Sequence, residues 1–119
     1  MVVEAKVGRI IVERLTSGKD LLEEIKRVVK EANVKSGFLL AIGALSKAVF
    51  GYYEEEKREY KKIEINELLE ILSCIGNISE AEGEEKIIHA HITVGNSKGE
   101  AYGGHILPGC IIGPTVELI

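Results

Sequence analysis

The segment of residues 86–107 constrains the fold more than any other part of the chain, because it predicts a β-hairpin. Two runs rich in Ile, Val and Tyr flank the polar, glycine-bounded loop of residues 95–99. This pattern is typical of two antiparallel strands joined by a short connection. All three histidines of the chain lie in the hairpin, namely His89, His91 and His105.

The spacing of these histidines places them on one face of the predicted hairpin. Residues two apart in a strand point to the same face, about 6.5–7 Å apart, as His89 and His91 do. If the loop is centred on Ser97, His105 lies opposite His89 and Gly103 lies opposite His91. Directly opposed residues have Cβ atoms about 4.5–5.5 Å apart. The two glycines before His105 leave room beside the rings, whereas a slip of one residue would turn His105 to the other face.

Three converging imidazoles are a ligand set for Zn²⁺ that leaves a fourth coordination position for water or another ligand. The sequence therefore predicts one zinc per chain, bound by His89, His91 and His105, with water or a small anion at the open position. The alternative interpretation is three unconnected histidines, two on a strand surface and one in a loop.

The length of 119 residues predicts a single domain over residues 1–119 with a hydrophobic core. Hydrophobic residues make up 45% and charged residues 29%, which is typical of a folded globular chain. No apolar run approaches the ~18–20 residues of a membrane span, and the N-terminus lacks a signal-peptide pattern. We expect a cytoplasmic protein without a membrane partner. The absence of Gln and the abundance of Ile, Glu and Lys give a thermophile-like composition.

The charge balance disfavours nucleic acid as a partner. The formal net charge is −4, and no stretch is densely basic. Binding to duplex DNA depends on several Lys or Arg contacts to phosphate, so an acidic chain is mildly repelled. Cys74 and Cys110 form no CxxC motif and are expected to be buried, reduced thiols.

The apolar pattern predicts one main helix, over about residues 20–33. Asp20 is the expected N-cap, Glu23 completes a capping-box pattern, and Asn33 can end the helix. The apolar residues of this segment follow helical spacing, and the charged face is expected to be exposed to solvent.

Strands are predicted over residues 2–14, 37–45, 46–54, 60–65, 86–94, 100–107 and 110–119. Gly8 lies where the apolar phase of the first strand changes, which indicates a β-bulge. Gly43 marks a bend or bulge, and residues 55–59 form a charged hairpin tip. Pro114 indicates that the last strand is at an edge or contains a bulge.

Residues 66–78 are ambiguous between a helix and a strand, and the closing Gly76-Asn77 and the β-rich surroundings favour the strand. Glu70 would then lie within an apolar strand, either near the metal or its open position, or facing solvent or a cation of another subunit. Thr115 and Glu117 share a face of the last strand and could accept a hydrogen bond from a histidine Nδ1–H. Ordinary strand polarity explains them equally well.

Five segments resemble, in order, the motifs of the plants-and-prokaryotes-conserved (PPC) domain. They are Gly-Ala-Leu-Ser-Lys-Ala (43–48), Leu-Glu-Ile-Leu-Ser-Cys-Ile-Gly-Asn-Ile (69–78), His-Ala-His-Ile (89–92), Gly-Glu-Ala-Tyr-Gly-Gly-His-Ile (99–106) and Thr-Val-Glu (115–117). The resemblance implies an α/β fold of the α+β type, with a largely antiparallel twisted β-sheet and one main helix. It implies a homotrimer, and zinc bound in prokaryotic members by residues that correspond to His89, His91 and His105. It also implies DNA as a partner, because in land plants the domain follows an AT-hook in nuclear DNA-binding proteins. The Arg-Gly-Arg-Pro of an AT-hook does not occur in this sequence.

Three hypotheses for function follow. The first is a trimeric zinc-binding module with a DNA-associated or regulatory role. The second is a zinc-dependent decarboxylase or hydrolase acting on a small anionic substrate, because the fold is also similar to that of acetolactate decarboxylases; Glu70 would be its general base. The third is a structural trimer whose histidines have no function. No catalytic residue is assigned.

Overall fold

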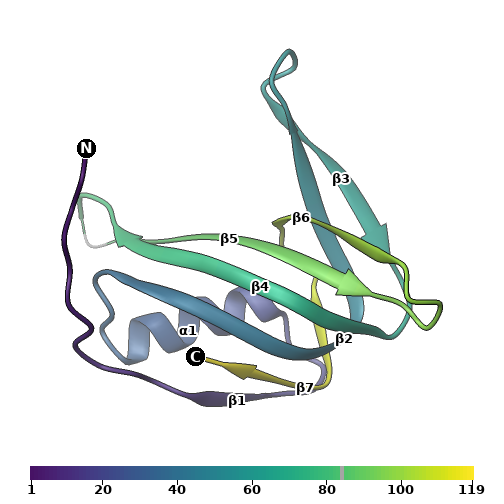
Figure 1. The fold of residues 1–119 in the computed structure, drawn as a ribbon, viewed down its shortest axis with the longest axis horizontal. Coiled ribbons are helices and arrows are strands. Elements are labelled where there is room, and N and C mark those ends of the chain that lie inside the picture. The colour runs from purple at the N-terminus through teal and green to yellow at the C-terminus, as the bar shows by residue number, and fades with distance from the viewer. Residues whose placement is uncertain (84) are drawn as a thin grey trace.

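The computed structural model describes residues 1–83 and 85–119. These residues form an antiparallel sheet of seven strands, one helix and the segments that connect them (Figure 1). The strand order is β1-β7-β2-β4-β5-β6, with β3 paired to β2. This architecture confirms the predicted fold class. The elements are β1 (Glu13–Thr16), α1 (Leu21–Glu31), β2 (Gly37–Glu54), β3 (Glu59–Ile65), β4 (Leu69–Glu80), β5 (Lys86–Gly95), β6 (Ala101–Ile106) and β7 (Ile111–Leu118).

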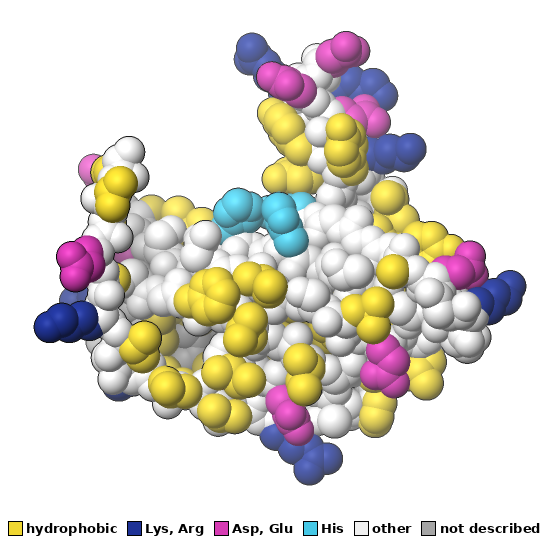
Figure 2. All heavy atoms as spheres, viewed as in Figure 1, with side chains coloured by type: hydrophobic (Ala, Val, Ile, Leu, Met, Phe, Trp, Pro, Cys, Tyr) yellow, Lys and Arg dark blue, Asp and Glu magenta, His cyan; other side chains and the backbone are white. Residues whose placement is uncertain are grey.

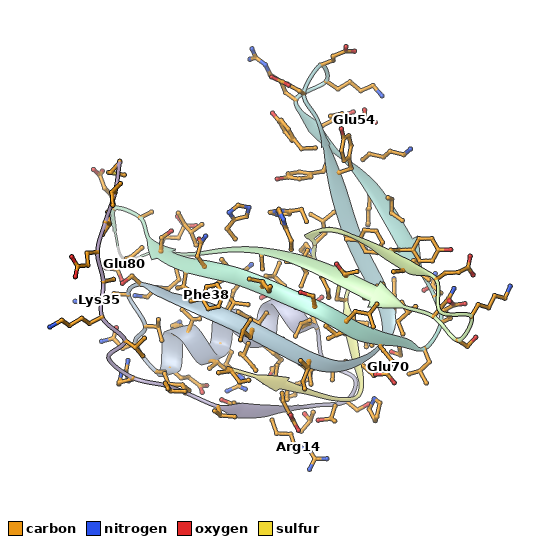
Figure 3. The ribbon with its side chains drawn as sticks, viewed as in Figure 1. Arg14, Lys35, Phe38, Glu54, Glu70 and Glu80 are labelled. Carbon is orange, nitrogen blue, oxygen red and sulfur yellow. The ribbon has the colours of Figure 1, made fainter. Side chains whose placement is uncertain are left out.

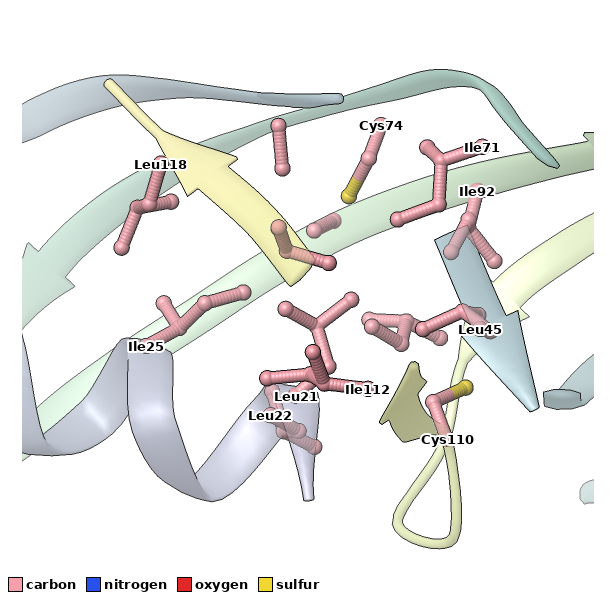
Figure 4. Close-up of a cluster of buried hydrophobic side chains, with 14 of the residues drawn as sticks. Leu21, Leu22, Ile25, Leu45, Ile71, Cys74, Ile92, Cys110, Ile112 and Leu118 are labelled. Atoms are coloured by element: carbon pink, nitrogen blue, oxygen red, sulfur yellow. The ribbon is translucent and has the colours of Figure 1, made fainter. Parts of the chain in front are cut away.

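Helix α1 begins and ends where its capping residues predict. Asp20 Oδ1 accepts a hydrogen bond from the backbone N–H of Glu23 at 3.1 Å, and Asn33, with a φ of 51°, follows the last turn. Its apolar stripe packs into the core against the sheet (Figure 4). No helix of the described chain is long and apolar enough to cross a membrane. The buried apolar side chains of α1 are Leu21, Leu22, Ile25, Val28 and Val29.

One residue of the charged face of α1 is not exposed as predicted. Glu24 is buried, and its Oε2 accepts hydrogen bonds from Arg27 Nε and Nη2 at 3.0 and 2.8 Å. Lys19 Nζ lies 3.7 Å from the other carboxylate oxygen. A helical period alone could not predict this burial, because Lys19 precedes the helix and the pairing depends on how the chain enters it.

Strand β2 runs through both predicted strands of residues 37–45 and 46–54 without a break. Gly43 has a φ of 137°, and a Cβ there would lie 2.2 Å from the carbonyl oxygen of Thr115. The pairing of β2 with β4 shifts between Leu40 and Gly43, which confirms the predicted bulge. Only glycine can adopt this backbone at so close a contact.

The two halves of β2 belong to different parts of the sheet. Its first half pairs with β4 and β7, and its second half pairs with β3 and β6. Strands β2, β4, β5 and β6 therefore close into a ring. The β2–β3 hairpin projects from the body as an arm (Figure 1), with the predicted charged turn at its tip.

Strand β4 resolves the ambiguous segment as a strand, as favoured. Leu69 and Ile71 point into the core, a register shift with β5 follows between Ile71 and Ser73, and Cys74 points inward after it. Both cysteines are buried and free, as predicted.

Strand β7 lies between β1 and β2, so the alternative that Pro114 marks a sheet edge is wrong. The bulge alternative holds, since the register of β7 with β2 shifts twice between Gly43 and Lys47. Proline lacks the N–H that a regular ladder position would use.

The prediction of a strand over residues 2–14 is wrong for most of its length, because β1 includes only Glu13–Thr16. Glu13 lies opposite Leu118 of β7, so the same register would place Val12 opposite Ile119. Residues 1–11 therefore extend past the last described residue of their neighbouring strand. The sequence pattern of a strand is present here, but the described chain supplies no strand beside it.

Candidate metal centre

Three imidazole rings lie together on the outer face of the sheet, which is the face turned away from helix α1. They are next to the base of the β2–β3 arm (Figure 2). His89 and His91 project from β5 and are exposed, and His105 projects from β6 and is partly buried. The ring centroids are 5.2 Å apart for His89 and His91, 5.6 Å for His89 and His105, and 5.8 Å for His91 and His105. The interpretation of three unconnected histidines is therefore wrong.

The register of the β5–β6 hairpin differs by two residues from the predicted one. His105 lies opposite His91, whereas His89 lies diagonally across from it. The hairpin closes at Gly95 and Ala101, and Asn96 Oδ1 caps the loop by accepting hydrogen bonds from the N–H groups of Lys98 and Glu100 at 3.0 Å each. A two-residue shift keeps every side chain on its face, so the three rings still converge.

The glycines before His105 have a different role from the one predicted. Gly103 lies opposite Thr93 rather than His91. A Cβ on Gly103 would lie 2.4 Å from the carbonyl oxygen of Ile92, and one on Gly104 would lie 2.5 Å from that of Gly51. The two glycines allow β6 to fit closely between β5 and β2, which places His105 beside the other two rings.

The surroundings of His105 favour its neutral form. Burial lowers the pKa of His105 below its ordinary value, and the nearby imidazoles of His89 and His91 lower the pKa further. A neutral imidazole is the form that binds a metal ion. His105 therefore has little competition from protons for a metal ion near neutral pH.

The donor atoms of the three rings fit a metal ion with small adjustments. One ring nitrogen from each histidine can be chosen so that all three lie within 4.8 Å of one another. Ligand atoms of a tetrahedral zinc site lie about 3.3 Å apart when Zn–N is about 2.05 Å. His89 and His91 are exposed, so rotation about their side-chain bonds can bring their donor atoms closer to that of His105.

Tyr60, which the sequence did not indicate, is part of the site. The ring of Tyr60 stacks on that of His105, with centroids 4.8 Å apart and an interplanar angle of 27°. The ring of Tyr53 packs edge-on against that of Tyr60, with centroids 5.3 Å apart. Gly51 lies beneath Tyr60, where a Cβ would lie 2.9 Å from the tyrosine ring. The Tyr53–Tyr60 pairing is a local feature of the β2–β3 hairpin, but its proximity to His105 depends on the distant pairing of β2 with β6.

The other predicted site residues do not join the histidine group in the described structure. Glu70 lies opposite Gly95, at the end of β5 away from His89 (Figure 3). Thr115 Oγ1 donates a hydrogen bond to the carbonyl of Leu15. Glu117, also on β7, is separated from β5 by β2 and β4. Glu70 is therefore not next to the histidines of its own chain in the described structure.

Comparison with solved structures gives close matches to the whole fold. A metal-containing protein from Archaeoglobus fulgidus is 38% identical with a TM-score of 0.87, over 99% of this chain and 81% of that chain. A plant- and prokaryote-conserved protein from Pyrococcus horikoshii is 35% identical with a TM-score of 0.88, over the same shares. A candidate DNA-binding protein from Bacteroides thetaiotaomicron is 26% identical with a TM-score of 0.86, over 96% and 78%.

This chain spans less than a fifth of the length of the curated relatives that it matches. The bifunctional protein GlmU of Synechococcus sp. strain JA-2-3B'a(2-13) is 34% identical over 107 residues, which is 89% of this chain. The match spans only 16% of the length of GlmU. Residues 2–119 match the Plants and Prokaryotes Conserved (PCC) domain, the domain that the resemblance indicated under the abbreviation PPC. This chain therefore belongs to the Plants and Prokaryotes Conserved domain family.

Proposed function

We propose that this protein binds one Zn²⁺ per chain through His89, His91 and His105. The observation that carries the proposal is the convergence of the three rings, with donor nitrogens within 4.8 Å of one another. Three nitrogen ligands and no thiolate suit zinc, and a site with three protein ligands keeps one position open. The similarity to a metal-containing protein from Archaeoglobus fulgidus supports the proposal.

The open position suits water or a small anion, because three neutral imidazoles leave the +2 charge of the ion uncompensated. His89 and His91 are exposed on the sheet face and His105 is only partly buried, so such a ligand can reach the site from solvent. This accessibility favours a module that senses or holds a ligand, and we propose a regulatory role for the site.

Metal analysis of the protein purified without a histidine tag tests the proposal. The wild-type chain is expected to contain close to one zinc, and His105→Ala is expected to lose it, because two remaining imidazoles bind zinc weakly. Asn77→Ala is the matched control, since Asn77 is exposed and lies opposite His89 on β4. Zinc retained by His105→Ala, or absent from the wild-type protein in zinc-containing buffer, would contradict the site.

We further propose that the chain assembles as a homotrimer, as the family resemblance implies. The support within the chain is the number of large hydrophobic side chains left exposed on the outer sheet face. Light scattering coupled to size-exclusion chromatography measures the mass directly. Trimers of wild type and His105→Ala alike would separate assembly from metal binding, whereas a monomer at micromolar concentration would contradict the trimer.

DNA association is a second candidate function that one surface feature favours. Four lysines, Lys26, Lys30, Lys35 and Lys86, line a hollow of about 580 Å³ that also includes Glu80. The similarity to a candidate DNA-binding protein from Bacteroides thetaiotaomicron adds support. The net charge of −4 opposes it, so binding to duplex DNA is expected to be weak and to fall steeply with salt.

Fluorescence anisotropy with a labelled duplex at several salt concentrations tests this second function. The double variant Lys26→Glu/Lys30→Glu is expected to abolish binding, whereas Lys57→Glu/Lys61→Glu on the β2–β3 arm, with the same charge change, leaves it. Equal loss in both variants would indicate that overall charge, and not the hollow, attracts DNA.

A further inference from the structure

Residues 1–12, here called the N-terminal arm, expose an unusual amount of apolar surface. Ile11 is partly buried and packs against the core, but the other large apolar side chains of the arm are exposed, from 67% for Val12 to 116% for Met1. Valines at positions 3 and 7 alternate with the charged Glu4 and Lys6, as in a strand that has one face covered. The exposed apolar residues of the arm are Met1, Val2, Val3, Val7, Ile10 and Val12.

The backbone of the arm has no partner within the described residues. The ladder between β1 and β7 starts at Glu13 and Leu118, and no backbone hydrogen bond joins the arm to another described residue. The polar contact that the described structure gives the arm is Arg9 Nη2 donating to the carbonyl of Ala32 at 2.7 Å. A segment with the pattern of a strand therefore lies where no described strand can pair with it (Figure 1).

The outer sheet face carries a second exposed apolar surface, which we call the outer apolar row. Ile119 and Leu40 exchange two backbone hydrogen bonds of 2.9 Å, Leu40 lies opposite Ile75, and Ile75 lies opposite His91. The row thus crosses the sheet from β7 to the metal centre (Figure 2). Phe38, labelled in Figure 3, adds to the exposed apolar surface beside the row and is 66% exposed.

We infer that the N-terminal arm of one copy of this chain packs on the outer apolar row of another copy. The two surfaces match in chemistry, and each is left uncovered by the chain that carries it. Large contiguous apolar patches are rare on monomers, and extended segments commonly bind a second chain by adding a strand or covering a sheet face. The charged Glu4 and Lys6 would then face solvent.

The geometry of the contact also predicts how the copies are arranged. The N-terminal arm and the outer apolar row are different surfaces of one molecule, so a contact between them is heterologous. Copies joined in this way form a closed ring when the rotation from one copy to the next divides a full turn evenly. A closed ring of three copies agrees with the proposed homotrimer. Because the row ends at His91, each docked arm would lie beside the metal centre of the neighbouring copy.

Two double variants of the full chain test the inference. Val3→Ser/Val7→Ser removes apolar contacts from one side of the arm, and Glu4→Ser/Lys6→Ser changes the other side as a matched control. The valine variant is expected to raise the dissociation constant for self-association at least ~10-fold, as measured by sedimentation velocity. The control is expected to change it less than ~3-fold.

Amide hydrogen exchange of residues 2–12 gives an independent measurement. Amides of the arm are expected to be protected at high protein concentration and to exchange freely on dilution, because the protecting surface belongs to another copy. Protection that is independent of concentration would assign the arm to its own chain and overturn the inference. Unchanged association of the valine variant would overturn it as well, and zinc content, measured separately, reports only on the metal site.

Discussion

His105 is the residue at which the separate parts of the candidate site come together. Its backbone lies opposite His91 of β5 on one side and Gly51 of β2 on the other. Among the described residues no hydrogen bond holds its ring, and the stack with Tyr60 is the closest aromatic contact. The orientation of the third imidazole therefore depends on a side chain of the β2–β3 arm.

Replacing Tyr60 with alanine is expected to weaken zinc binding about 2–10-fold, which corresponds to the value of one aromatic pair. The reason is that His105 would gain rotational freedom, which binding must then remove. Tyr60→Phe keeps the ring and is expected to keep the affinity. Competition with a chelator of known affinity measures each dissociation constant.

Tyr52→Ala is the control for Tyr60, because Tyr52 is an exposed aromatic residue of the same β2–β3 arm whose ring stacks on none of the three histidine rings in the described structure. Equal affinities for wild type and Tyr60→Ala would show that the stack does not position His105. Equal losses in Tyr60→Phe and Tyr60→Ala would instead assign the effect to the hydroxyl group.

At the scale of elements, the start of α1 is joined to its surroundings by charged groups. Asp20 Oδ2 accepts a hydrogen bond from the N–H of Gly109 at 2.6 Å, which connects the helix to the segment before β7. Arg27 bridges Glu24 and Glu31 within the helix and contacts Glu13 of β1. These contacts hold α1 against β1 and β7.

Glu24→Gln is expected to lower the free energy of unfolding at pH 7 by about 1–2 kcal/mol. Hydrogen bonds from Arg27 lower the pKa of Glu24 below its ordinary value of 4.5, although burial opposes them. A lowered pKa in the folded state stabilises the fold fully above the ordinary pKa, and this stabilisation is lost as the pH falls through the folded-state pKa. The difference between wild type and variant should therefore shrink below about pH 4.5.

Denaturant unfolding at pH 7, 5, 4 and 3 measures this difference. Glu31→Gln is the control, since Glu31 also contacts Arg27 but its side chain is 64% exposed. Its effect is expected to stay below ~0.5 kcal/mol. A Glu24→Gln variant that shows the same pH profile as wild type would contradict the assigned role of the carboxylate.

Elements whose signals are local could be predicted from the sequence. Helix α1 has its cap and apolar period within about a dozen residues, and the parity of the histidines placed all three on one face. The register of the hairpin required the closure at Gly95 and Ala101, and the stacking of Tyr60 required the pairing of β2 with β6. The N-terminal arm shows the limit most clearly, because its pattern is that of a strand whereas pairing depends on a neighbour elsewhere.

For the whole molecule, the decisive feature is that the strands of the first half of the sequence have all their sheet neighbours in the second half. β7 lies between β1 and β2, and β2 pairs with β3, β4, β6 and β7. The first half of the chain, through β2, therefore contains no pair of adjacent strands. All the pairings of β1 and β2 are made with strands from the second half.

This interleaving predicts that the protein can be divided into two peptides, the first of which needs the second to form any of its strand pairs. A break between Lys57 and Arg58, at the exposed tip of the β2–β3 arm, separates residues 1–57 from residues 58–119 without interrupting a strand. The first peptide alone is expected to give the circular dichroism of an unstructured chain, and an equimolar mixture to recover the spectrum of the intact sheet. At concentrations below the dissociation constant of the two peptides, reassembly would occur only when two molecules that carry them come close together.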